Sequence, residues 1–585
     1  MAAHRERCKR GYQSDGPSAV NQPADPPARN SALAPRAGLF TSGAPSAGRR
    51  PALAGKSKRQ SLTRKADMEA QNDGAVGRRD TGATLSLSAR ASYGVGAAVD
   101  GFTLTSLSTF QLFYLTAVCG LSNTLAGASI SLTLCVDALA DPLFGSLSDN
   151  GRGRLGRRHP FMFGAILPLA LAFGLLFSVP TGLKGWSLFV YVTLASIALR
   201  VAHSAFNLPY VALGMELSAD YAERTKVAAS RFLFNVLASL GCLVLGQGVF
   251  LHGPNGLLDR AGYSSFGWAC GAVAATAGLF CAFATLGLRR LSPTGASATT
   301  QGLVGQASGA IEIFRNPSFV SLFLSTLLVS TGIGVALALS LHVNRFFWEL
   351  PSQVVLYVLL ASPIGILAGS VATVLATRIL EKRFVAIAGL MIIALSQFTL
   401  PVLKVVHLLP TSGWGLYAIL IGNAFVATGA AVGCVGITTQ SILADAVDQH
   451  EYLFGTRREG LYFAGLNFAG KAAVGLGALI AGAALDVIGL PPDIASSVAS
   501  GVRLPPETVR ILGLVQGPGV AIMTVIATGI FLHLRLDRAA HGRIQAELAQ
   551  GRRAAARLPD AGRGDSREPY WSAQSGKSVR ESERF

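Results

Sequence analysis

The chain has 585 residues, of which 50% are hydrophobic and only 14% are charged, whereas about 25% charged residues is usual in soluble domains. Its formal net charge is +18 and its mean hydropathy is +0.44. This composition excludes an ordinary soluble globular protein, because so much apolar surface cannot be hidden from water by a monomer. It predicts a protein whose middle lies in lipid, and the 66 glycines suit close packing of membrane helices.

The first 90 residues hold 16 Lys and Arg against 7 Asp and Glu and have no apolar periodicity. We expect a disordered basic extension over 1–90, with a start at Met68 as an open alternative. No secretory apolar region is present, and Glu6 and Asp15 argue against an organellar transit peptide. The basic tails have no accompanying aromatic-basic module, so no nucleic-acid partner is expected.

Twelve apolar segments follow, each long enough to cross a bilayer core of about 30 Å. Backbone polar groups need internal partners in lipid, so the segments should be helices and the fold all-α. The predicted spans are 93–119, 122–147, 161–180, 187–213, 227–250, 263–288, 318–345, 352–377, 383–407, 413–441, 460–485 and 508–534.

The longest interior polar stretch divides these spans into six plus six. We therefore expect an N-terminal half over 91–288, a central cytoplasmic loop over 289–315, a C-terminal half over 316–536 and a disordered cytoplasmic tail over 537–585. Loops on the side of the termini carry 14 Lys and Arg against 6 on the other side. This bias predicts a multi-pass protein of the plasma (inner) membrane, with both termini cytoplasmic.

The seven cysteines form no CxxC pair and no cluster with histidine, so neither a structural metal nor a disulfide framework is predicted. The histidines are dispersed, and no Ser/His/Asp arrangement suggests an enzyme. We expect no cofactor.

Three polar motifs interrupt the apolar pattern, at 136–160, 207–231 and 443–471. In the first, Asp137 and Asp141 are four residues apart and share a helix face. Two neighbouring carboxylates inside a membrane repel each other unless a proton or cation lies with them. A solvated position at the helix end is the alternative, but Asp137 lies about 18 Å from Asp149 along the helix.

Other charged side chains also lie well inside predicted spans. Arg200, His203 and Asn207 form one polar stripe that faces a cavity or holds the bundle together. Arg231 and Lys471 line a cavity or snorkel toward the headgroups. Lys471 could neutralise the carboxylate pair from the other half, and an intramembrane acid, Asp100, lies on the first helix.

In this order and spacing, the three motifs resemble the glycoside–pentoside–hexuronide:cation symporter family, which includes the melibiose permeases, over residues 90–540. The resemblance implies the major facilitator fold with a site between the halves. It implies a site for H⁺ or Na⁺ at Asp137, Asp141 and Asn207. The predicted substrate-binding residues are Asp100, Arg200, His203, Tyr210, Arg231 and Lys471.

The chain departs from the melibiose-permease pattern at three positions. Asn207 stands where those permeases have an acid, and the missing charge favours protons over sodium. Val211 and Gly436 stand where galactoside carriers have tryptophans, so galactosides are not favoured.

The loop over 145–158 also resembles the major facilitator signature between the second and third helices. It predicts ion pairs between the halves that close the cytoplasmic face, with positive-inside anchoring as the alternative. The predicted gate residues are Asp149, Arg154, Arg157, Arg158, Asp445, Asp448, Arg457 and Arg458.

The sequence therefore predicts a monomeric secondary transporter, surrounded by membrane lipid, that couples a cation to a sugar or glycoside by alternating access. Two alternatives stay open, a carrier of a lipid-like or amphipathic solute and a non-transporting membrane sensor.

Overall fold

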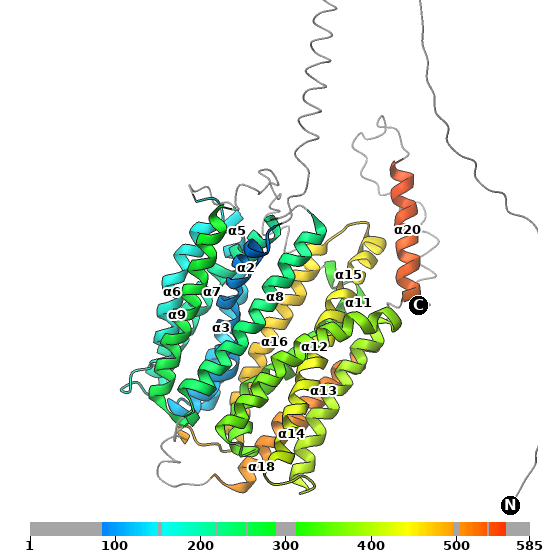
Figure 1. Cartoon of the computed structure of the whole chain (residues 1–585). Helices are drawn as coiled ribbons and strands as arrows, with labels where there is room; N and C mark the ends of the chain where they lie inside the picture. Colours follow the sequence, from blue (N-terminus) through cyan, green and yellow to red (C-terminus); the bar gives the residue numbers. More distant parts are fainter. Residues whose placement is uncertain are drawn as a thin grey trace, which may run out of the picture. The chain divides into compact units, whose positions relative to one another are not determined.

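The computed structural model describes residues 85–149, 155–217, 220–252, 256–287, 312–494, 504–534 and 538–556. All of them belong to one compact unit, Gly82–Phe585. Within the described residues the elements are helices joined by short connections (Figure 1). The predicted extension before residue 85, nearly all of the central loop and the end of the tail lie outside the described residues.

The N-terminal half begins with a segmented helix and continues with long ones. Its elements are α2 (Leu87–Val95), α3 (Ala97–Thr105), the π-helical η1 (Ser106–Phe110), α4 (Gln111–Phe113), π-helical η2 (Tyr114–Val118), α5 (Asn123–Asp149), α6 (His159–Phe177), α7 (Gly185–Glu216), α8 (Tyr221–Leu243), π-helical η3 (Val244–Phe250), the short 3₁₀ helix η4 (Gly256–Leu258) and α9 (Arg260–Thr285).

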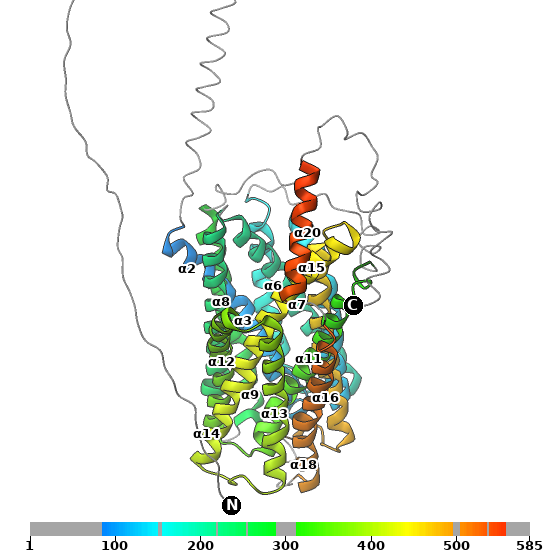
Figure 2. The same cartoon turned by 90° about the vertical axis from the view of Figure 1, so that its right-hand side faces the viewer.

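The C-terminal half has the same kind of elements. They are α11 (Pro317–His342), π-helical η6 (Val343–Phe347), α12 (Ser352–Ile379), α13 (Lys382–Val405), α14 (Trp414–Asn423), π-helical η7 (Ala424–Ala431), α15 (Val432–Phe454), α16 (Glu459–Val487), α18 (Pro506–Leu514), π-helical η8 (Val515–Gly519) and α19 (Val520–Phe531). The polar helix α20 (Arg538–Ala556) follows, within the segment that was predicted to be a disordered tail. Figure 2 shows these helices from the side.

The predicted all-α membrane fold of about twelve helices is confirmed. Eleven helices of the described residues are long and apolar enough to cross a membrane. The first predicted span, 93–119, is helical from Ala97 to Val118 but is more polar than the others, with Asp100 and Gln111 inside it. Because polar groups within a membrane helix need partners or a cavity, this segment should face the interior of the bundle.

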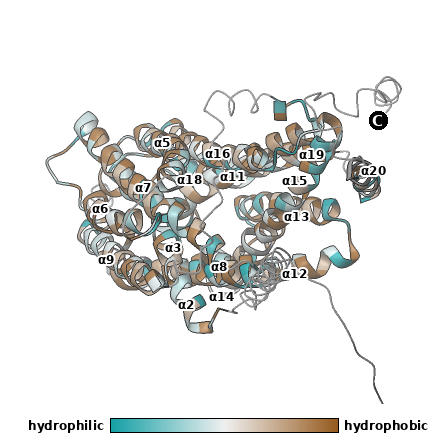
Figure 3. Cartoon of the chain, turned by 90° about the horizontal axis from the view of Figure 1, so that it is seen from above, coloured by the Kyte–Doolittle hydropathy of each residue, from teal (hydrophilic) through white to brown (hydrophobic). Residues whose placement is uncertain are grey.

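Many large apolar side chains point away from the bundle, and hydrophobic colour predominates along the helices in Figure 3. Leu139 is 73% exposed and Leu167 67% exposed, which suits contact with lipid tails. Between the helices, small residues allow close approach. A Cβ on Gly127 of α5 would lie 2.6 Å from the carbonyl oxygen of Ala478 in α16, so no larger residue fits there.

Several contacts between the halves lie at the end where α5 begins and α16 finishes. Asp486 of α16 accepts from Asn123 Nδ2 and from the backbone N–H of Thr124, both at 2.8 Å. Thr116 Oγ1 lies 3.0 Å from His342 Nε2. These bonds hold the halves together at that end of the bundle.

Candidate functional site

The predicted carboxylate pair lies where α5, α7 and α16 meet. Lys471 of α16 donates to Asp137 Oδ2 at 2.9 Å and also forms an ion pair with Asp141. Ser204 Oγ lies within hydrogen-bond distance of both carboxylates, 3.0 Å from Asp137 and 2.9 Å from Asp141. Arg200 Nη1 lies 3.8 Å from Asp137 Oδ2. One lysine thus joins the C-terminal half to two acids of the N-terminal half.

This site is formally neutral, with two carboxylates, one ammonium and one guanidinium. The side chain of Asp137 is only 5% exposed, whereas those of Asp141 and Lys471 are 27% and 36% exposed. An arriving cation would therefore meet Asp141 first. Because a buried carboxylate needs a positive partner, a cation that binds here can replace Lys471 and release the contact between the halves.

A second cluster surrounds Asp100 of α3. His203 Nε2 of α7 lies 2.9 Å from Asp100 Oδ1, and Asn235 Nδ2 of α8 donates to Asp100 Oδ2 at 2.9 Å. Asn207 Nδ2 is 3.5 Å from Asp100 Oδ1. The structure therefore places Asn207 with Asp100 and not with the carboxylate pair, and its part in a cation site stays a prediction.

The two clusters share one helix of the N-terminal half. His203 contacts Asp100 and the next residue, Ser204, contacts Asp137 and Asp141. Consecutive helical side chains point about 100° apart, so neighbours on α7 reach acids on two different helices. Ser204 and Asn235 were not predicted. Their signal is weak in sequence, since an uncharged Ser or Asn is common in membrane helices.

Two predicted substrate-binding residues, Tyr210 and Arg231, lie outside the two clusters just described. Tyr210 is fully buried, donates from its hydroxyl to the carbonyl oxygen of Tyr93 at 3.0 Å and stacks on that ring at 4.6 Å. It is therefore packed between helices and does not line either large cavity described below. Arg231 is half-buried on α8 and does not line these cavities either.

A cavity of about 470 Å³ lies between the two halves. The N-terminal half contributes residues of α3, η1 and α8, among them Asn235, and the C-terminal half contributes residues from α11 to α19. Asn235 therefore connects this cavity to Asp100. A smaller cavity of about 250 Å³ lies within the C-terminal half, among α11, α13, α15, α16 and α19.

The predicted gate residues of the N-terminal half pair within that half. Arg157 and Arg158 contact Glu216 at 3.2 and 3.0 Å, and Arg158 also donates to Ser148 at 2.8 Å. Arg154 and the side chain of Asp149 lie outside the described residues.

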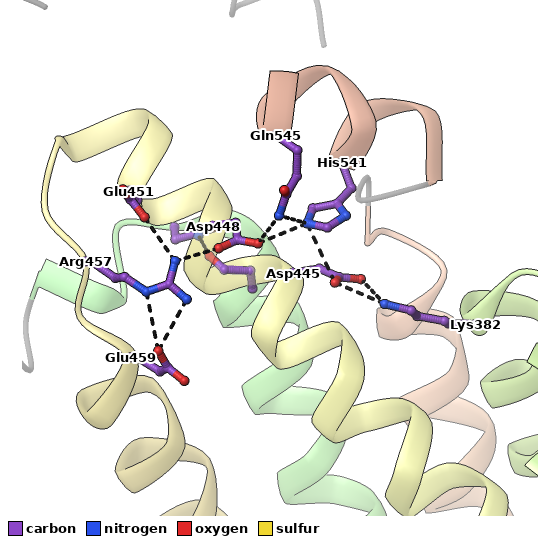
Figure 4. A network of polar contacts seen from close by, with 10 residues as sticks. Lys382, Asp445, Asp448, Glu451, Arg457, Glu459, His541 and Gln545 are labelled. Atoms are coloured by element: carbon purple, nitrogen blue, oxygen red, sulfur yellow. Dashed lines mark hydrogen bonds and ion pairs between the residues drawn. The ribbon is translucent and has the colours of Figure 1, made fainter. Parts of the chain in front are cut away.

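The gate residues of the C-terminal half form a network with α20 (Figure 4). Lys382 pairs with Asp445 at 2.9 Å, Arg457 pairs with Asp448 at 2.9 Å, and Gln545 of α20 donates to Asp448 at 2.7 Å. His541 lies 3.2 Å from Asp448. α20 lies beside α15 in both side views.

Arg457 and Arg458 have carboxylate partners close by. Bonds from Glu451 and Asp448 hold the pKa of Arg457 above its usual value, so its charge is fixed. Arg458 pairs with Glu312 at 3.0 Å. The ion pairs given for these gate residues join partners within a half, in the central loop or on α20. Ion pairs between the halves stay a prediction.

Residues 92–535 match the protein family described as MFS/sugar transport protein. The chain belongs to this family. The predicted resemblance to cation symporters of glycosides is confirmed, and neither open alternative is favoured.

Among curated relatives, an uncharacterized symporter of Synechocystis sp. is 35% identical over 166 residues, which is 28% of this chain and 30% of that protein. That match therefore spans less than a third of the relative. A glucuronide carrier protein homolog of Escherichia coli is 25% identical over 436 residues, with 72% of this chain and 90% of the relative covered.

Among solved structures, a mutant of the nucleoside transporter NupG aligns with a TM-score of 0.53 and 12% identity, over 77% of this chain and 99% of that one. At this identity the likeness shows the fold alone. The protein is thus a multi-pass membrane protein of a transporter family, as predicted.

Proposed function

We propose that the protein couples the movement of H⁺ or Na⁺ to the symport of a sugar or glycoside by alternating access. The observation that carries the proposal is the contact of Lys471 with both Asp137 and Asp141 across the halves. A cation at that site competes with the lysine for the same oxygens, so ion binding and the packing of the halves are linked.

The arrangement favours a proton as the coupling ion. Asn207 stands where the melibiose permeases have an acid, and here it contacts Asp100 and not the carboxylate pair. The site therefore has one negative charge fewer to offset a metal cation, whereas a proton needs only one carboxylate oxygen. Protonation of the more exposed Asp141 would weaken its attraction for Lys471.

A connected set of contacts links this site to the cavity. Asn235 lines the cavity and donates to Asp100, which contacts His203, and the neighbouring Ser204 contacts the carboxylate pair. A solute that binds Asn235 on α8 therefore acts on α7 through Asp100 and His203. The ion acts on the same helix through Ser204. Symport needs only that each ligand favours the binding of the other.

The remaining predictions form part of this proposal. Both termini lie in the cytoplasm, the membrane is the plasma (inner) membrane and the working form is a monomer. The ion pairs on Arg157, Arg158, Arg457 and Arg458 hold each half rigid in the present state, and in the alternate state the same charged ends meet across the halves. The loop charge bias supports this orientation.

Solute uptake into proteoliposomes driven by an imposed ion gradient tests the ion site. In the variant Asp137→Asn with Asp141→Asn, we expect solute uptake to lose its dependence on a proton or sodium gradient. The control is Asp259→Asn, because Asp259 caps α9 far along the chain and Asn is an equally good cap. Unchanged cation dependence in the double variant would rule out the ion site.

A further inference from the structure

We infer that the cavity between the halves carries an electrically neutral glycoside with an apolar face, and that it rejects uronides and sugar sulfonates. This inference rests on the proposed function and names the substrate class of the same transporter.

The first observation is the absence of ionisable groups from the cavity wall. The described residues that line it include no Asp, Glu, Lys, Arg, His, Cys or Tyr. An anionic sugar would need a cation in contact with its carboxylate or sulfonate, usually Arg or Lys. The described part of the wall provides none.

The second observation is that nearby cations are already engaged. Lys404 donates to the carbonyl oxygen of Phe347 and lies 4.9 Å from the centre of that ring and 5.1 Å from the centre of Trp348. Trp348 lines the cavity, so Lys404 is kept behind it. Lys471 and Arg200 are held by the carboxylate pair.

Arg231 is the remaining basic residue to consider, since it lies one turn before Asn235 on α8. It is not among the residues that line the cavity, but its side chain is half-buried nearby. It is therefore the residue that an anionic solute would have to recruit, and the experiment below includes it.

The third observation is the chemistry of the wall itself. Amides of Asn344, Gln397 and Gln516 line the cavity. Amides both donate and accept, which matches the hydroxyls of a neutral sugar. Hydroxyls of Ser and Thr add further partners, while Trp348 and Phe232 provide flat apolar surface for the C–H face of a ring or for an aglycone. The volume of about 470 Å³ is within the usual range of about 300–1,000 Å³ for small-molecule sites.

The fourth observation is the backbone around the cavity. The π-helical segments η1, η6, η7 and η8 all contribute residues to its wall. Such turns are rare and often occur at functional sites, and here they come from both halves. This favours the cavity, and not the smaller one inside the C-terminal half, as the solute compartment.

A panel of sugars, each supplied in a neutral and an anionic form, tests the inference in proteoliposomes. Neutral hexosides are each compared with their own uronide and 6-sulfonate by counterflow, and binding is measured in parallel by competition. We expect the neutral member to be favoured by at least about 30-fold, because an anion buried without a partner is strongly disfavoured. Gln516→Lys puts a cation in the wall and should shift preference toward the anion by at least about tenfold, whereas Gln440→Lys, outside this cavity, should not.

The outcomes separate the two proposals. A neutral preference that Gln516→Lys reverses supports the inference. Equal or better transport of the anions overturns the inference while leaving symport intact, and loss of that anion transport in Arg231→Gln would identify the recruited cation. Failure of every member of the panel to bind or exchange overturns the proposed function, and the inference with it.

Discussion

Removal of the Lys471 ammonium should destabilise the protein measurably. At an effective dielectric constant of about 20, the attraction of Lys471 for Asp137 at 2.9 Å is about 6 kcal/mol before desolvation. Desolvation and solvent screening offset most of it, because the lysine is 36% exposed. We therefore expect Lys471→Met to lose about 2 kcal/mol, less than the 3–5 kcal/mol typical of a fully buried broken pair.

The measurement is unfolding in mixed detergent micelles, with Lys382→Met as the control. Lys382 is 39% exposed and pairs with one carboxylate, Asp445, so its loss should cost no more than about 1 kcal/mol. In Lys471→Met, lower pH or added Na⁺ should restore stability, because a proton or cation takes the place of the ammonium. The ion that does so identifies the coupling ion.

A double variant makes this reasoning refutable. In Lys471→Met with Asp141→Asn, one carboxylate and Arg200 remain, so the site is neutral again and most of the lost stability should return. Strictly additive losses would show that the lysine and the acid do not interact. A loss no larger than that of Lys382→Met would show that the contact between the halves adds nothing to stability.

Three further variants test the surrounding structure. Asp100→Asn should weaken solute binding at least about tenfold, because Asp100 orients Asn235 in the cavity wall through a charge-assisted bond, while thermal unfolding stays near the parent value. Asp486→Ala should increase labelling of a cysteine engineered between the halves at the end where α5 begins, because two bonds to α5 are lost; unchanged labelling would show that these bonds do not close that end. His541→Ala should speed tryptic cleavage within α20 several-fold without changing counterflow, since His541 helps to hold that helix to Asp448; altered counterflow would give α20 a role in transport.

The helices could be predicted from the sequence because lipid imposes the same requirements on every span. A segment must be apolar, must be long enough to cross the bilayer, and must satisfy its own backbone hydrogen bonds. Eleven of the twelve predicted spans meet those terms by length and composition. The segment Ala97–Val118 is not among them; it carries Asp100 and Gln111, which bond to partners inside the bundle. The π-helical turns could not be predicted, because local propensity gives no signal for them.

The site was partly predictable for a related reason. Charges within membrane spans are few, so Asp137, Asp141, Arg200 and Lys471 could be selected by position alone. It was harder to predict which of these side chains contact one another, because that depends on how each helix is rotated about its axis. Asn207 contacts Asp100 instead of the carboxylate pair, and Tyr210 packs on Tyr93. The neutral wall of the cavity could not be predicted from the sequence, because its Ser, Asn and Gln residues are scattered over several helices and form no motif.

The separation of charge from the cavity restricts how coupling can work. The proposed ion site uses α5, α7 and α16, whereas the described wall of the proposed solute cavity carries no ionisable group, so ion and solute would share no direct contact in this state. Any effect of one on the other must pass through side chains or through the packing of the halves. The side-chain route runs through Asn235, Asp100 and α7, and the packing route runs through Lys471. Asn235→Leu cuts the first route and leaves the second, so residual cation dependence in that variant would measure how much coupling the movement of the halves supplies on its own.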